Sequence, residues 1–244
     1  MAKIFITGSA DGLGYLAAKM LIELGHQVVL HARNAERRLE VIRKAQGAVS
    51  VLTGDLSNIE ETKKLAHEVN RIGTLDAVIH NAGVYQASAK EIFAVNTLAP
   101  YILTCLIQRP KRLIYLSSGM HLQGHSKLDY FNTNISRITY SDSKLHVLIL
   151  CMAVARKWKD VYANALEPGW VATKMGGPSA PDSLEDAPKT QAWLAVSNDP
   201  GALVTGKYFY HMQQSPFNPI AKDVQAQDKF LLECQRFSGI TFPQ

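Results

Sequence analysis

Short apolar runs alternate with amphipathic stretches through most of this chain, and no other feature limits its fold as strongly. The apolar runs predict strands at Lys3–Thr7, Gln27–His31, Val49–Thr53, Leu75–His80, Lys111–Ser117, Tyr162–Glu167 and Lys207–Tyr210. Apolar residues at three- and four-residue intervals predict helices at Leu13–Leu24, Ala35–Ala45, Asn58–Arg71, Ala89–Ile107 and Tyr140–Lys157. A strand–helix–strand order requires parallel pairing with right-handed crossovers. We therefore expect an α/β fold, a doubly wound parallel sheet of about seven strands with helices on both faces.

The alternating unit continues to about residue 170 without a linker, a charge block or a low-complexity segment, so we expect residues 1–244 to form one domain. The segment 174–190 is rich in glycine and proline and too long for an ordinary connection, which predicts a lid over the substrate. Residues 211–244, with a helix-like stretch at Asp223–Phe237, match no motif and are expected to be a C-terminal extension.

Composition excludes several classes of protein. The 26 basic and 21 acidic side chains give a net charge of +5, and no basic run exceeds two residues, so a nucleic-acid partner is not expected. The uncharged stretch Phe93–Gln108 is too short and polar to span a membrane, and no apolar signal core is visible at the N-terminus, so we expect a cytoplasmic protein. Cysteine and histidine spacings predict neither a disulfide framework nor a metal site.

Glycines follow the first predicted strand in the stretch Thr7-Gly8-Ser9-Ala10-Asp11-Gly12-Leu13-Gly14 and lead into the first helix. Backbone N–H groups and the helix dipole at such a turn favour an anionic pyrophosphate. The alternative is an ordinary tight turn between a strand and a helix.

Arg33 stands near the end of the second predicted strand, where an acidic residue would bind the 2′-hydroxyl of an adenosine ribose. A guanidinium there suits a 2′-phosphate instead, so NADP(H) is favoured, with NAD(H) as the alternative. Two observations weigh against this interpretation. Arg33 also fits a solvated charge at a helix start, and Asp11 places a negative charge inside the glycine turn.

Tyr140 and Lys144 lie four positions apart at the start of a predicted helix, so both side chains project from one face. A nearby ammonium stabilises a phenolate and lowers the tyrosine pKa toward the working range, which makes this pair a candidate for acid–base catalysis. The alternative is an ordinary surface pair. Ser118 follows the strand Lys111–Ser117 at the sheet edge where ligands bind, and its hydroxyl suits a hydrogen bond to a substrate carbonyl.

These features occur in an order that resembles the classical short-chain dehydrogenase/reductase family, whose members have a Rossmann fold. The motifs cover residues 4 to about 175: Thr7-Gly8-x-x-x-Gly12-x-Gly14, Gly54-Asp55-Leu56, Asn81-Ala82-Gly83, Ser118, Tyr140-x-x-x-Lys144 and Pro168-Gly169-x-Val171-x-Thr173. The resemblance implies four catalytic residues, Asn96, Ser118, Tyr140 and Lys144. It also implies a cofactor site made by Gly8, Ser9, Asp11, Gly12, Leu13, Gly14, Arg33, Asp55, Leu56, Asn81, Ala82, Gly83, Tyr140, Lys144, Pro168, Gly169, Val171 and Thr173.

The chain departs from the family pattern in two places. The intervals around Asn96 are short, so the helix that often forms the family's dimer interface looks trimmed; a homo-oligomer and a monomer both stay open. Residues 119–139 form a long insertion before Tyr140, similar in length to that of retinol dehydrogenases and NADP(H)-linked carbonyl reductases, and it is expected to border the substrate.

The resemblance implies an NADP(H)-dependent oxidoreductase that transfers a hydride between nicotinamide and a ketone or aldehyde, or the corresponding alcohol, with Tyr140 as general acid/base. The first alternative is a non-catalytic sensor or scaffold that binds a dinucleotide on the same fold. A nucleotide-sugar epimerase or dehydratase shares the tyrosine–lysine chemistry, but the chain is too short for the extra substrate domain that those enzymes have, and its glycine spacing differs from theirs.

Overall fold

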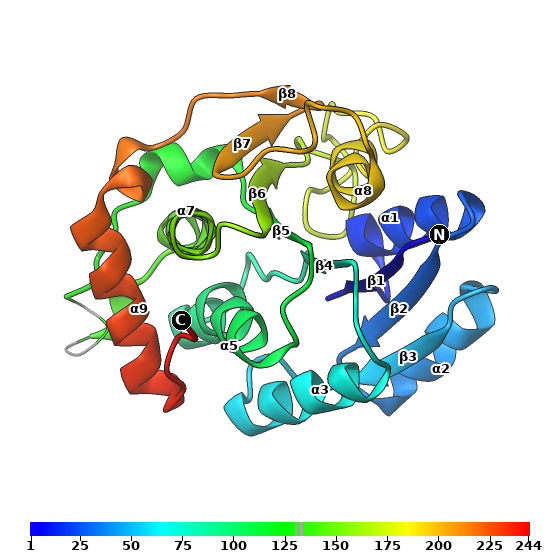
Figure 1. Cartoon of the computed structure of the whole chain (residues 1–244), viewed down its shortest axis with the longest axis horizontal. Helices are drawn as coiled ribbons and strands as arrows, with labels where there is room; N and C mark the ends of the chain where they lie inside the picture. The colour runs from blue at the N-terminus through cyan, green and yellow to red at the C-terminus, as the bar shows by residue number, and fades with distance from the viewer. Residues whose placement is uncertain (130, 132–133) are drawn as a thin grey trace.

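In the described part of the chain, eight strands form one sheet through the middle of the molecule (Figure 1). This computed structural model describes residues 1–129, 131 and 134–244. The sheet order is β3-β2-β1-β4-β5-β6-β7-β8, with bounds β1 Lys3–Ile6, β2 Gln27–Ala32, β3 Ser50–Thr53, β4 Ala77–His80, β5 Arg112–Leu116, β6 Tyr162–Glu167, β7 Lys207–Tyr210 and β8 Gln213–Gln214. β1 to β7 are parallel, which confirms the predicted α/β sheet. β8 pairs antiparallel with β7, and its two glutamines carry no apolar pattern that predicts a strand.

Helices cover both faces of the sheet (Figure 1). One face carries α1 (Gly12–Glu23), α2 (Ala35–Lys44) and α8 (Lys189–Val196), and the other carries α3 (Ile59–Arg71), α5 (Ala99–Leu106) and α7 (Tyr140–Lys157). Phe5 packs into the core beneath α3, α5 and α7, whereas Ile4 and Ile6 pack into the core beneath α1, α2 and α8. Successive strand residues therefore enter opposite cores, which is why the strands are apolar throughout.

The strand order reverses at β1, which pairs with β2 on one side and β4 on the other. In open α/β sheets, ligands bind in the crevice outside the carboxyl ends of the strands at such a point. The fold therefore brings the glycine turn after β1 next to the loops that follow β2 and β4.

The long helix predicted over Ala89–Ile107 is interrupted. It consists of α4 (Ala89–Ile92), a π-helical segment η1 (Phe93–Leu98) and α5. The side chain of Asn96, which lies in η1, is buried. It forms hydrogen bonds with the loop after β4 and with α7. Segments of π-helix are rare and occur frequently at functional sites.

Several short elements have no signal in the sequence pattern. α8 follows a glycine- and proline-rich segment and is buried on most sides, so it lacks the one-sided apolar period of a surface helix. The 3-10 turns η2 (Gly119–Gln123), η3 (Ile135–Arg137) and η4 (Pro219–Lys222) are too short for periodicity to detect.

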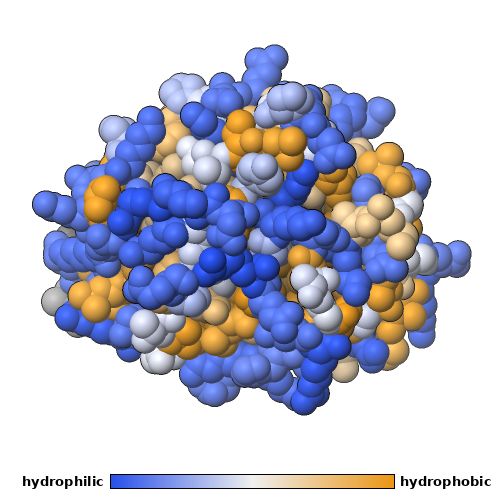
Figure 2. Space-filling model, in the orientation of Figure 1, coloured by the Kyte–Doolittle hydropathy of each residue, from blue (hydrophilic) through white to orange (hydrophobic). Residues whose placement is uncertain are grey.

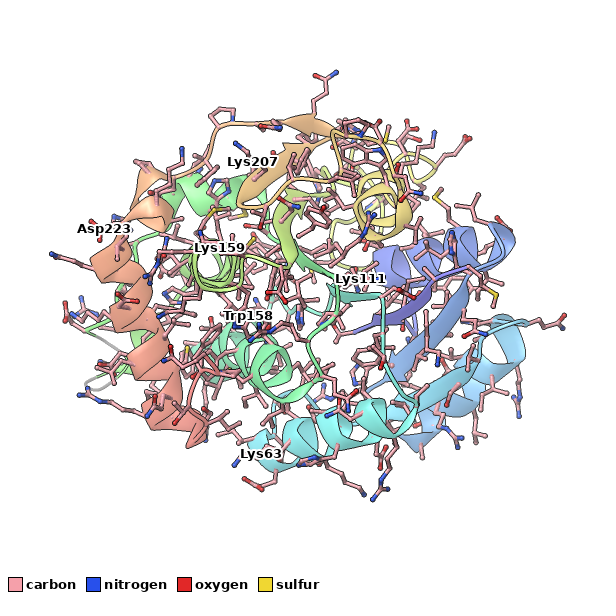
Figure 3. All side chains as sticks on the ribbon, viewed as in Figure 1. Lys63, Lys111, Trp158, Lys159, Lys207 and Asp223 are labelled. Carbon is pink, nitrogen blue, oxygen red and sulfur yellow. The ribbon has the colours of Figure 1, made fainter. Side chains whose placement is uncertain are left out.

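The helix-like stretch near the C-terminus is confirmed as α9 (Val224–Ser238), which packs against α7 and ends at Gly239 in a left-handed conformation. Figure 3 labels Asp223, the N-cap of α9, and Trp158, which lies where α7 ends. Among the described residues, no helix has both the length and the apolarity needed to cross a membrane.

Candidate active site

A cavity of about 640 Å³ opens at the carboxyl ends of the strands on both sides of β1. Most of the predicted cofactor-binding residues line it: Gly8, Asp11, Gly12, Leu13, Arg33, Asp55, Leu56, Asn81, Ala82, Gly83, Tyr140, Lys144, Pro168 and Thr173. Ser9, Gly14, Gly169 and Val171 are not part of its wall. The motif residues thus gather around one continuous cavity, but these four lie outside its lining.

The glycine turn is shaped by backbone conformation and by close approach. Gly8 and Gly12 have φ values of +62° and +55°, which only glycine adopts without strain. A Cβ on Gly14 would lie 2.4 Å from Asn81 Nδ2 and 2.6 Å from the Gly8 carbonyl oxygen. Asn81 Nδ2 also donates hydrogen bonds to the carbonyls of Thr7 and Gly8, at 2.9 and 3.1 Å. Gly14 and Asn81 therefore hold the turn in place.

His31, which the motif search did not single out, joins three strand ends beneath the cavity. Its Nδ1 accepts a hydrogen bond from the Gly8 N–H at 2.9 Å, so its Nε2 carries the proton and donates to the Gly54 carbonyl at 2.8 Å. Burial lowers the pKa of His31, which keeps the ring neutral as this pattern requires. The Ser9 hydroxyl is also engaged with backbone, between the Ile6 carbonyl and the His31 N–H. From the sequence alone, a histidine at the end of an apolar strand is interpreted as a residue that packs in the core, so this role of His31 was not predicted.

Charged side chains surround the end of the cavity near β2 and β3 in two groups. Arg33 is paired with Asp55 at 2.9 Å and approaches Glu91 at 3.8 Å, and its side chain is 60% exposed.

The second group is centred on Asp11, which contacts Lys174 at 2.5 Å and Arg37 at 3.2 Å. The hydrogen bond from Lys174 is the main reason that the pKa of Asp11 falls to about 2. Two cations therefore offset the negative charge that Asp11 places in the glycine turn.

Tyr140 begins α7, and Ser118 lies close enough to its hydroxyl to lower the tyrosine pKa. Lys144 Nζ lies 5.4 Å from the centroid of the Tyr140 ring and donates to the Leu116 carbonyl at 2.9 Å. Tyr85 packs edge-on against Tyr140, with ring centroids 4.8 Å apart. The structure thus brings three of the four predicted catalytic side chains close together: Tyr140 and Lys144 line one end of the cavity, and Ser118 lies beside Tyr140 outside the cavity wall.

Burial dominates the protonation of the tyrosine–lysine pair. It raises the pKa of Tyr140 to about 12, against the lowering effect of the hydrogen bond with Ser118. It also lowers the pKa of Lys144 to about 8. The expected net lowering of the tyrosine pKa is therefore wrong, because the effect of burial outweighs the stabilisation of the phenolate by the Lys144 ammonium, which lies over the ring and is hydrogen-bonded to a backbone carbonyl.

Asn96 does not meet the other three residues in the cavity. Its Oδ1 accepts from the Val84 N–H at 2.8 Å, and its Nδ2 donates to the Val84 carbonyl at 2.9 Å and to Ser143 Oγ at 3.0 Å. The side chain is buried and these contacts occupy it fully. Asn96 thus ties the loop after β4 to α7, next to Tyr140 and Lys144.

The predicted lid lines the cavity, whereas no described residue of the insertion 119–139 does. Met175 and Leu184, from the segment 174–190, line the cavity, and Lys174 contacts Asp11 across it. The insertion 119–139 includes 130, 132 and 133, which lie outside the described residues. Asp142, buried in the first turn of α7, anchors the rest of the insertion through the His125 N–H and the Lys127 ammonium.

The residues present fit a dinucleotide with an anionic centre. Gly12 has no neighbour closer than 3.9 Å to the position of a Cβ, so backbone is open to a ligand there. The first turn of α1 meets the cavity at Gly12 and Leu13, and its positive dipole end favours phosphate. Arg33, Arg37 and Lys174 add cationic groups to the same wall.

Comparison with known proteins identifies the family of this chain. Residues 2–183 match the family model described as short chain dehydrogenase. The chain is 44% identical to an uncharacterized oxidoreductase of Emericella nidulans, covering all of this chain and 99% of the relative. It is 41% identical to the short-chain dehydrogenase chyC of Penicillium rubens over the full length of both.

More distant matches agree. Retinol dehydrogenase 13 of Homo sapiens is 26% identical, with 98% of this chain and 85% of that protein covered. The crystal structure of an uncharacterized protein from Mycobacterium paratuberculosis has the same fold, with a TM-score of 0.83, 22% identity, and 100% and 96% of the two chains covered. The chain is therefore an oxidoreductase that belongs to the short-chain dehydrogenase family.

Proposed function

We propose that this protein is an NADP(H)-dependent carbonyl reductase, which transfers a hydride between nicotinamide and a ketone or aldehyde, or the corresponding alcohol. One observation carries the proposal: Tyr140 and Lys144 line the end of a cavity built on a glycine turn, with the Lys144 ammonium 5.4 Å from the Tyr140 ring and Ser118 close enough to lower the Tyr140 pKa. A proton donor and a polarising hydroxyl side by side support the binding of a substrate oxygen between them.

The protonation states favour reduction as the starting direction. A tyrosine with a pKa near 12 is protonated at neutral pH, so Tyr140 begins as a general acid that gives its proton to the substrate oxygen. Ser118 donates a hydrogen bond to the same oxygen and polarises the carbonyl. Nicotinamide supplies the hydride when it is bound. The positive charge of Lys144 stabilises the phenolate that remains after proton transfer.

The proposed cofactor contacts follow the cavity wall. Gly8, Gly12, Leu13 and the backbone around them hold the pyrophosphate at the N-terminus of α1. On the adenosine side, Arg33 binds the 2′-phosphate, and Arg37 stands close enough to the glycine turn to add a second guanidinium. Lys144 and Thr173 face the nicotinamide end. Ser9, Gly14 and Asn96 support these contacts through the backbone.

The test is a fluorescence titration with NADPH and NADH, followed by turnover of a panel of aldehydes and ketones at saturating cofactor. The proposal predicts NADPH binding and consumption of at least one carbonyl compound. Tight NADPH binding without turnover across a broad panel would instead support a dinucleotide-binding sensor.

Tyr140→Phe tests the acid directly, because it removes one hydroxyl and keeps the ring that packs on Tyr85. We expect turnover to fall by at least about 100-fold, the usual contribution of a positioned general acid. NADPH affinity should stay within about threefold, since the hydroxyl faces Ser118. Tyr162→Phe, at the start of β6 and outside the cavity, is the matched control and should retain full turnover. Undiminished turnover in Tyr140→Phe would overturn the mechanism.

A further inference from the structure

A buried polar cluster lies behind Ser118 and takes no part in the mechanism above. It contains His121, on η2, Glu167, at the carboxyl end of β6, and Tyr208, on β7. β6 and β7 are paired neighbours, and Ala165 lies opposite Tyr208, so Glu167 and Tyr208 project from the same face of the sheet. The His121 ring packs edge-on against Tyr208, with centroids 4.7 Å apart.

The cluster holds both polar groups of a single peptide unit, the one between Ser118 and Gly119. On one side, the Ser118 carbonyl accepts hydrogen bonds from the His121 backbone N–H at 2.9 Å and from His121 Nδ1–H at 2.6 Å. On the other side, the Glu167 carboxylate lies against Gly119, close enough that the Gly119 N–H lowers the Glu167 pKa against the effect of burial and that a Cβ on Gly119 would lie 2.6 Å from Glu167 Oε2. A peptide plane held at both its oxygen and its nitrogen cannot rotate without breaking these contacts.

This restraint determines where the Ser118 hydroxyl points. The Ser118 backbone is extended, with φ −166° and ψ 152°, and its Oγ accepts the Met120 N–H at 3.3 Å as the N-cap of η2. Rotation about ψ of Ser118 would move η2 and with it the Met120 N–H that Oγ accepts, so the clamp keeps this hydrogen bond to the serine hydroxyl in place. The same hydroxyl lies close enough to Tyr140 to lower the tyrosine pKa.

The polar groups of the cluster lower the stability of the folded protein, and apolar residues of similar size would fill the same space without this loss. With Nδ1 donating to the Ser118 carbonyl, His121 Nε2 is a buried acceptor that has no hydrogen-bond partner among the described residues. The Glu167 carboxyl is partly buried, and burial raises its pKa. A leucine at 121 and a glutamine at 167 would avoid these costs. A Cβ at 119 would lie 2.6 Å from Glu167 Oε2, so a larger residue there would displace the carboxylate from the Ser118–Gly119 peptide.

We propose that His121 and Glu167 are positioning residues that clamp the Ser118–Gly119 peptide and thereby aim the Ser118 hydroxyl at Tyr140 and the substrate oxygen. The assignment of a catalytic role to Ser118 rests on the proposed function. The clamp itself is a property of the fold and is measurable without turnover.

Paired substitutions separate the clamp from simple packing. His121→Asn keeps an N–H donor near the position of Nδ1, whereas His121→Leu removes it. Glu167→Gln keeps an acceptor for the Gly119 N–H without the charge, whereas Glu167→Leu removes it. His125→Leu is the matched control, since this histidine lies on the same insertion with a side chain that is 78% exposed.

The first readout is amide hydrogen exchange of residues 117–123 in the protein without added cofactor. We expect exchange there to be at least fivefold faster in His121→Leu and Glu167→Leu, and unchanged in His125→Leu. The second readout is kinetic: kcat should fall about tenfold in both leucine variants, which corresponds to about 1.4 kcal/mol. NADPH affinity should stay within twofold, and the asparagine and glutamine variants should recover most of kcat.

Equal exchange and equal kcat in His121→Leu and His121→Asn would overturn the clamp. Parallel losses of kcat and NADPH affinity would also overturn it, because they indicate general disruption of the site. If the wild-type protein reduces no carbonyl compound, the proposed function fails, and the exchange measurement still decides whether the peptide is clamped.

Discussion

In the proposed function, the choice between NADPH and NADH depends most directly on Arg33. Its guanidinium forms one close ion pair with Asp55 and a longer one with Glu91, and both pairs are partly exposed to solvent. Exposed ion pairs of this kind contribute little, so a 2′-phosphate dianion can take over the guanidinium at small cost.

We expect Arg33→Ala to weaken NADPH binding by about 10- to 100-fold, the range for one charge-assisted contact, and to change NADH binding by less than about threefold. Fluorescence titration of both cofactors measures this ratio. Arg43→Ala, at an exposed position in the last turn of α2, is the matched control and should affect neither cofactor. Equal losses for NADPH and NADH would show that Arg33 does not read the phosphate.

Lys144 shows that the site is maintained at the expense of stability. The folded protein lowers the lysine pKa from its usual 10.5 to about 8, so the unfolded chain holds more protons between these values. Unfolding free energy should therefore rise with pH from about 8 to 10.5. Below pH 8, where Lys144 is charged in both states, the lowered pKa of Lys144 corresponds to a destabilisation of the folded protein on the order of 3 kcal/mol.

Lys144→Met should remove this penalty while it abolishes turnover. We expect unfolding free energy at pH 7 to increase by about 2 kcal/mol, since loss of the hydrogen bond to the Leu116 carbonyl offsets about 1 kcal/mol of the gain. Urea unfolding at several pH values also tests whether the alkaline rise disappears. Lys19→Met, at a 60% exposed lysine, should leave the pH profile of wild type. A less stable Lys144→Met protein would contradict the burial penalty.

At the scale of elements, the glycine turn and η1 show how two loops are held against each other. Gly14 lies inside α1, where alanine would normally stabilise the helix by about 1 kcal/mol. The Cβ of an alanine, however, would meet Asn81 and the Gly8 carbonyl at distances that real structures do not contain. The loop after β4 would have to move, and with it the wall of the cavity.

Gly14→Ala should therefore destabilise the protein by about 1–3 kcal/mol, the usual cost of overpacking, in spite of the gain in helix propensity. NADPH affinity should fall at least about tenfold, because Asn81 and the Gly8 backbone line the cofactor cavity. Thermal unfolding and the fluorescence titration check the two effects. A protein as stable as wild type with unchanged NADPH affinity would show that the turn is not held by this contact.

At the scale of the whole molecule, the parallel sheet was predictable because most of its strands are buried on both faces and are largely apolar. The cavity was largely predictable for the same reason: motifs at strand ends must meet at the carboxyl edge. His31, Glu167 and the π-helical turn at Asn96 were not, because their roles depend on which strands become neighbours. Sequence spacing does not predict such contacts. A polar residue within an apolar run cannot be distinguished by its sequence from a residue that only fills the core.

The C-terminal segment bears on assembly, since the resemblance implies a dimer interface made by the helices that correspond to α5 and α7. In this chain α9 packs on α7 (Figure 1). The residues after α9 return to the same region: the Tyr101 hydroxyl, on α5, donates to the Ile240 carbonyl, and Trp158 donates to the Pro243 carbonyl. On the face seen in Figure 2, hydrophobic side chains occur in small groups among hydrophilic ones.

We therefore expect a monomer in solution, because the chain covers with its own C-terminal segment the faces of α5 and α7 that a partner would need. Light scattering after size-exclusion chromatography should give a mass near 26.9 kDa at micromolar concentration. Removal of residues 239–244 should lower the melting temperature, since Tyr101, Trp158 and Arg109 each lose a hydrogen-bond partner there. A wild-type dimer whose dissociation follows substitutions on α5 or α7 would contradict this role of the C-terminal segment.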